Sequence, residues 1–113
     1  YNAKLTPQSE VRDGMITSIE PGLYREGKWG IRIENLVVAT GITQKAGGEF
    51  GEFMAFETLT LCPIDTRCID SSLLTKEEVA WLNEYHQEVR ERLAPKLSCE
   101  RALAWLNERT AAI

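Results

Sequence analysis

Hydrophobic and polar positions follow one period in the first half of the chain and another in the second. The first half is rich in glycine, threonine and β-branched residues, which suit a pleated surface with two different faces. Runs of this kind predict three strands, at residues 15–19, 30–40 and 53–62. The connections between them are too short for a crossover helix, so the strands are expected to pair antiparallel.

Turn residues separate these strands. Pro21-Gly22 and Glu26-Gly27 lie between the first two strands, where Gly27 can supply a positive φ at little steric cost. A glycine-rich stretch at residues 47–51 predicts a flexible loop before the third strand.

The second half has helical spacing. Thr75 and Glu78 stand three residues apart, the spacing of a capping box that satisfies free amides at a helix start. The apolar residues that follow recur on one helical face: Val79, Leu82, Val89 and Leu93. Pro95 is expected to end this helix. A shorter helix is predicted from Ser98, with a buried side formed by Ala102, Leu103, Trp105 and Leu106.

These patterns together predict an α+β fold, with antiparallel strands followed by two C-terminal helices. Residues 1–62 would form a half-sheet. Residues 63–113 would form a helical extension that packs on it, within a single structural unit. A hydrophobic content of 43% supports a core of modest size in 113 residues.

Composition argues against several classes of partner. A formal charge of −4 and a pI of about 5.1 lack the basic footprint of a nucleic-acid-binding protein. No apolar run approaches the ~20 residues that span a bilayer, so no membrane partner is expected. Cys62, Cys68 and Cys99 match neither a zinc motif nor a disulfide framework. Reduced thiols in a cytoplasmic protein are the expected state.

His86 is the one histidine of the chain. It falls at helical spacing from Leu82 and Val89, so it lies along the packed stripe of the first predicted helix. A hydrogen-bonded packing role is therefore expected for it. With one such histidine, no nucleophile and base pair can be assembled.

Three glutamates lie in strand-like, otherwise apolar surroundings: Glu20, Glu34 and Glu57. Burial of a carboxylate is costly unless it is paired or binds a metal ion, so each is expected to have a partner. Strand alternation places Arg32 and Glu34 on the same face of their strand. From spacing alone, a partly buried salt bridge of Arg32 with a carboxylate is the simpler interpretation, and metal binding stays open.

Two segments extend this interpretation. Residues 20–24 (EPGLY) and 30–35 (GIRIEN) resemble the last two signature segments of the Xaa-Pro aminopeptidases, or aminopeptidases P. These enzymes belong to the pita-bread metallopeptidases, together with methionine aminopeptidase and prolidase. The resemblance continues through residues 56–65 and 81–86, so it covers nearly the whole chain. It implies the C-terminal part of a pita-bread (creatinase/aminopeptidase) fold.

The resemblance also implies a dinuclear metal centre. In this family two divalent metal ions, commonly Mn2+, are held by two aspartates, one histidine and two glutamates. Glu20 matches the first glutamate, and Glu34 matches the second, which bridges both ions. Carboxylate oxygens suit hard cations, and one carboxylate can bridge two ions ~3.5–4 Å apart. Arg32 would orient a carboxylate or contact substrate. Glu57 would support the structure or a metal ligand, without binding metal itself.

The activity implied by the resemblance is hydrolysis of the bond between an N-terminal residue and a following proline. The partners would be peptides with proline at the second position. A homodimer through C-terminal elements is also expected. The aspartates and the ligand histidine are expected upstream of Tyr1, so this chain alone should bind metal weakly and lack activity. Two alternatives stay open: a non-catalytic pita-bread domain that binds proteins, and a relative of prolidase or methionine aminopeptidase.

Overall fold

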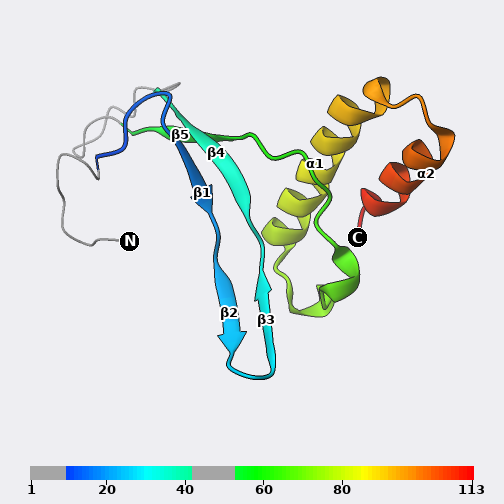
Figure 1. The fold of residues 1–113 in the computed structure, drawn as a ribbon, viewed down its shortest axis with the longest axis horizontal. Helices are drawn as coiled ribbons and strands as arrows, with labels where there is room; N and C mark the ends of the chain where they lie inside the picture. Colours follow the sequence, from blue (N-terminus) through cyan, green and yellow to red (C-terminus); the bar gives the residue numbers. More distant parts are fainter. Residues whose placement is uncertain (1–9, 42–52) are drawn as a thin grey trace. The chain divides into compact units, whose positions relative to one another are not determined.

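The computed structural model describes residues 10–41 and 53–113. The chain divides into two compact units, Tyr1–Thr60 and Leu61–Ile113. The first unit contains the strands and the second contains the helices (Figure 1). The predicted loop at residues 47–51 lies outside the described residues. The packing of the helical part on the sheet stays a prediction.

Four strands of the first unit form one long antiparallel hairpin (Figure 1). They are β1 (Ile16–Ile19), β2 (Gly22–Arg25), β3 (Trp29–Arg32) and β4 (Asn35–Thr40). β1 pairs with β4, ending at Ile19 opposite Asn35. β2 pairs with β3, beginning at Gly22 opposite Arg32. The β2–β3 pairs keep the register of the β1–β4 pairs, although two residues in each arm lie between the paired segments.

The outer side of β4 pairs with β5 (Ala55–Thr58), which completes a three-stranded sheet in the order β1-β4-β5. Val37 and Ala39 of the central strand β4 are its buried apolar residues among those described. Antiparallel pairing is therefore confirmed, and so are strands within all three predicted ranges.

Two details of the strand prediction were wrong. Residues 22–25 form β2, although Pro21-Gly22 and Glu26-Gly27 had indicated only turns there. Residues 30–40 are divided between β3 and β4 by a break at Ile33 and Glu34. Both errors have one cause, because turn residues at the ends of β2 hid a short strand whose partner is β3. The positive φ of Gly27, 68°, is confirmed in the turn between these two strands.

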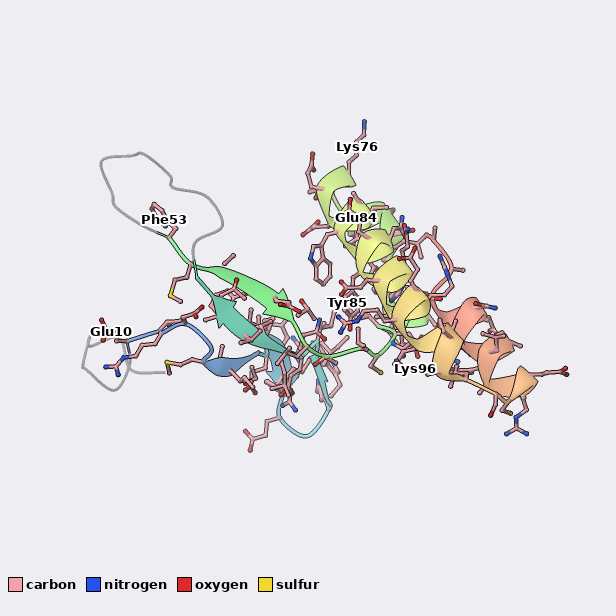
Figure 2. The ribbon with its side chains drawn as sticks, turned by 90° about the horizontal axis from the view of Figure 1, so that it is seen from above. Glu10, Phe53, Lys76, Glu84, Tyr85 and Lys96 are labelled. Atoms are coloured by element: carbon pink, nitrogen blue, oxygen red, sulfur yellow. The ribbon has the colours of Figure 1, made fainter. Side chains whose placement is uncertain are left out.

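The second unit is built on helix α1 (Lys76–Leu93), and Figure 2 shows Lys76 at the first turn of this helix. The capping box is confirmed, because Thr75 and Glu78 each bind the other's backbone amide. Pro95 falls in a short 3-10 turn, Ala94–Lys96, directly after α1. Helix α2 (Glu100–Arg109) follows.

The core of this unit joins the two helices. Leu106 of α2 is packed with Tyr85 and Val89 of α1. Partly buried hydrophobic residues surround them: Leu61, Ile64, Leu93 and Ala94. Trp105 was predicted to be buried, but it is 51% exposed. Neighbouring helical residues point about 100° apart, so the central place of Leu106 turns Trp105 toward the flank. No described helix has the length and apolar character needed to cross a membrane.

Candidate metal centre

Glu20 and Glu34 lie in the two breaks of the long hairpin. Continuing the register inward from Ile19 and Asn35 places Glu20 opposite Glu34. Continuing it from Gly22 and Arg32 gives the same pair. Directly opposed residues in an antiparallel ribbon project their side chains from one face, with Cβ atoms about 5 Å apart. The hairpin therefore brings together two carboxylates that are fourteen positions apart in the sequence.

Arg32 connects one of these carboxylates to a tyrosine. Its Nε donates to Glu34 Oε2 at 2.9 Å, and its Nη1 donates to the Tyr24 hydroxyl at 3.2 Å. The hydrogen bond to Tyr24, followed by the charge of Glu34, raises the pKa of the Arg32 guanidinium. The predicted salt bridge of Arg32 is present, but it is half exposed, with Arg32 at 47% and Glu34 at 38% side-chain exposure.

Tyr24 was not singled out from the sequence. It pairs directly with Gly30 across the β2–β3 ribbon. A Cβ added at Gly30 would lie 2.7 Å from the nearest ring atom of Tyr24. A Cβ added at Gly22 would lie 2.5 Å from the Tyr24 hydroxyl oxygen. The two glycines thus leave space for the ring beside Arg32. The signal was the alternation of Glu20, Gly22 and Tyr24 along one strand face.

Ser18 was also missed. Its hydroxyl donates to Glu20 Oε1 at 2.5 Å. The two residues are two positions apart on β1 and its extension, so they share a face. A Ser-x-Glu spacing in a strand was the available signal.

The expected burial of the three glutamates was wrong for this chain. Glu20, Glu34 and Glu57 are all exposed. Glu57 lies on β5, opposite Val38. Because the side chains of Glu20 and Glu34 are exposed, water can compensate their charge. Within residues 10–41 and 53–113, no group of three or more potential metal-binding side chains comes together.

The other face of the ribbon is apolar. An open hollow of about 300 Å³ lies beside the ribbon, lined by Pro21, Gly22, Leu23, Ile31, Arg32 and Ile33, and strand alternation places the four apolar side chains of this set on the face opposite the carboxylates. Leu23 pairs with Ile31 across the strands. The hairpin is therefore two-sided, with carboxylates on one side and aliphatic side chains on the other.

His86 has the packing role that its spacing predicts. It is fully buried in α1, and its Nε2 accepts the amide of Ile64 at 3.0 Å. Its Nδ1 has no hydrogen-bond partner in the part of the chain that the structure describes. Burial, followed by the charge of Arg90, lowers the pKa of the imidazole. The neutral ring is thus the form that accepts from Ile64.

The donor set fits divalent metal ions in kind, but it is incomplete. Two opposed carboxylates with one donor each keep further oxygen lone pairs for a hard cation. Two such residues supply too few protein ligands for a dinuclear site, which needs several from each side. The described residues of this chain therefore form one part of a metal centre.

Family models match most of the chain. Residues 2–41 match the metallopeptidase family M24, and residues 52–113 match the C-terminal region of peptidase M24. The first match contains both opposed glutamates, and the second contains β5 and both helices.

Similar proteins carry related names. A probable Xaa-Pro aminopeptidase P of Coprinopsis cinerea is 45% identical over 106 residues, which are 91% of this chain and 17% of that protein. Aminopeptidase P2 of Arabidopsis thaliana is 44% identical over 98 residues, 85% of this chain and 14% of that protein. This chain thus spans about one-sixth of the length of these relatives.

One solved structure gives the fold. The X-prolyl aminopeptidase of Caenorhabditis elegans, described as a cytosolic enzyme with a di-nuclear active site, matches with a TM-score of 0.76 at 37% identity. The match covers 91% of this chain and 17% of that one. It confirms the predicted fold class, the C-terminal part of a pita-bread fold with antiparallel strands before two helices.

Proposed function

The chain belongs to metallopeptidase family M24, and from this membership we propose that it forms part of a dinuclear-metal aminopeptidase that cleaves N-terminal Xaa-Pro bonds. The names of its relatives support the reaction class and the preference for proline. The di-nuclear site described for the C. elegans enzyme supports the number of metal ions.

One observation carries the proposal. Glu20 and Glu34 stand opposite each other in a shared register, and Arg32 binds the second of them. A salt bridge alone would need only one carboxylate. The second, opposed carboxylate supplies oxygen donors on the same face that the salt bridge with Arg32 does not use, and such donors suit a hard cation. The pair is therefore better explained by metal binding than by the structure of the hairpin.

The proposed roles of Glu20 and Glu34 follow the family resemblance of their two segments, and the role of Arg32 follows from its hydrogen bonds. Glu20 is assigned as a ligand of one metal ion, and Glu34 as the ligand shared by both. Arg32 holds Glu34 through Nε and keeps the Tyr24 hydroxyl on its other side, so it restricts how the carboxylate can turn. When bound, two divalent cations, with Mn2+ proposed, polarise the scissile carbonyl and lower the pKa of a shared water.

The wider setting is part of the same proposal. The substrates are peptides with proline at the second position, the enzyme is cytoplasmic, and it forms a homodimer. The 113-residue chain by itself is expected to bind metal ions weakly and to release no amino acid, because its described residues supply two of the ligands that the proposed site requires. Glu57 is assigned no ligand role.

The test is an assay of the full-length protein with Mn2+ on a peptide that has proline at the second position. Release of the first residue is expected, with loss on Glu34→Ala. Glu57→Ala is the matched control, because it removes a strand glutamate outside the proposed ligand pair. A peptide with alanine in place of proline should be cleaved more slowly. No release would favour the non-catalytic binding domain, and release unaffected by Glu34→Ala would contradict the ligand role of Glu34.

A further inference from the structure

Each of the two opposed glutamates receives a hydrogen bond from the side chain two positions before it. Arg32 donates to Glu34 at 2.9 Å. Ser18 donates to Glu20 at 2.5 Å. The spacing of two puts donor and acceptor on the same strand face in both arms of the hairpin. The two arms therefore repeat one arrangement, with a cationic donor in one and a neutral donor in the other.

Glu20 needs such support because of its place in the hairpin. It follows Ile19, the last paired residue of β1, and lies in the break before β2. Its side chain is exposed and has free rotation about several bonds. Ser18 lies within β1, is half-buried, and pairs with Leu36, so its position is fixed by the sheet. The hydrogen bond from the Ser18 hydroxyl therefore restricts where the Glu20 carboxylate can lie.

We propose that Ser18 is a positioning residue, which orients Glu20 for metal binding as Arg32 orients Glu34. This inference rests on the proposed function of Glu20 as a ligand. The hydroxyl uses one lone pair of Oε1 and leaves Oε2 for the metal ion. Because the donor is neutral, it fixes the carboxylate without withdrawing its charge, whereas the guanidinium at Glu34 offsets part of the charge there.

The variants Ser18→Thr and Ser18→Val test this directly, because they have the same shape and differ by one hydroxyl. The matched control is Thr17→Val, which removes a hydroxyl from the adjacent residue on the other face of β1. The affinity of the full-length protein for Mn2+ alone is measured by electron paramagnetic resonance of the free ion. We expect Ser18→Val to weaken Mn2+ binding about tenfold. Ser18→Thr should stay within about twofold of the wild type, and Thr17→Val should be unchanged.

The unfolding temperature of the metal-free protein separates positioning from folding. Equal unfolding temperatures for Ser18→Thr and Ser18→Val, with different Mn2+ affinities, support the inference. If valine lowers the unfolding temperature, Ser18→Ala replaces it in the same comparison. Wild-type Mn2+ affinity in both hydroxyl-free variants overturns the inference.

Glu20→Ala serves as the reference for the proposed function. If Glu20→Ala weakens Mn2+ binding and the hydroxyl-free Ser18 variants do not, the role of Ser18 fails while the ligand role of Glu20 stands. If Glu20→Ala itself binds Mn2+ as tightly as the wild type, the ligand role fails, and the inference about Ser18 fails with it.

Discussion

Glu20 stands opposite Glu34 because both arms of one antiparallel hairpin keep a single register across a break. The register on either side of the break leads to the same pairing. The turn that contains Gly27 therefore sets how the two carboxylates align, although it lies far from them along the strands. A slip of one residue would move every side chain of one arm to the other face.

Arg32 is expected to be needed in its own chemical form. Its Nε and Nη1 reach Glu34 and Tyr24 at the same time, which the single amine of a lysine does not reproduce. Arg32→Lys should lower the kcat/KM of the full-length enzyme about 10–100-fold. Arg25→Lys is the control, since Arg25 lies over Trp29 near the turn. An Arg32→Lys enzyme with wild-type kcat/KM would show that charge alone is sufficient.

Gly30 is expected to be required for the space it leaves. A Cβ there would lie 2.7 Å from Cδ1 of Tyr24, so Gly30→Ala must displace the ring. Because Tyr24 is 65% exposed, its ring can turn toward the solvent, and we expect a loss of at most about 1 kcal/mol in the free energy of unfolding, which includes the lost hydrogen bond to Arg32. The same substitution in a Tyr24→Ala background should cost little, because the ring is gone. Equal costs in the two backgrounds, measured by urea denaturation, would place the conflict elsewhere.

Tyr85 is expected to stabilise the segment that enters the second unit. Its hydroxyl donates to the Cys62 carbonyl at 2.9 Å and accepts the Cys62 amide at 3.4 Å. Tyr85→Phe removes the hydroxyl and keeps the ring that stacks on Trp81. The expected cost is about 1–3 kcal/mol, because a part-buried carbonyl loses its partner. Faster hydrogen exchange at the Cys62 amide should accompany the loss; unchanged exchange and stability would contradict this role.

His86 is expected to make the stability of the chain depend on pH. Burial lowers its pKa below the usual 6.5 in the folded state, so the unfolded chain binds the proton more tightly. The contribution of the neutral His86 ring to the free energy of unfolding is therefore complete above about pH 6.5. This contribution is lost as the pH falls below that value. For one proton, the slope reaches at most about 1.4 kcal/mol per pH unit.

The control for this pH dependence is His86→Gln, which keeps an acceptor for the Ile64 amide and does not titrate. As the chain has one histidine, the variant should show a flatter dependence of the unfolding free energy on pH below about pH 6.5. An equal slope in wild type and variant would assign the dependence to carboxylates instead.

Local sequence predicted the capping box at Thr75, the turn at Gly27 and the packed position of His86 well, because each depends on a few neighbouring residues. It failed where a partner decides the outcome. β2 exists because β3 pairs with it, and Trp105 is exposed because Leu106 occupies the core. Tyr85 was overlooked because its buried ring carries a hydroxyl that binds Cys62, and the spacing within the helix does not indicate that partner.

For the candidate site too, local sequence predicted single residues but not the relations between them. Glu20, Glu34 and Arg32 were singled out from two short segments. Their relation depends on the register, which no single segment contains. Tyr24 and Ser18 were missed because they act through hydrogen bonds to those residues. Alternation along one strand face is the sequence signal that groups Ser18 and Tyr24 with Glu20.

The most direct test is a crystal structure of the full-length protein soaked with Mn2+, with anomalous diffraction used to locate the ions. We expect two peaks, with carboxylate oxygens of Glu20 and Glu34 within about 2.0–2.6 Å of them and Glu34 in contact with both. Peaks that contact neither glutamate, with Arg32 still bound to Glu34, would contradict the assignment and leave the pair a structural feature of the hairpin.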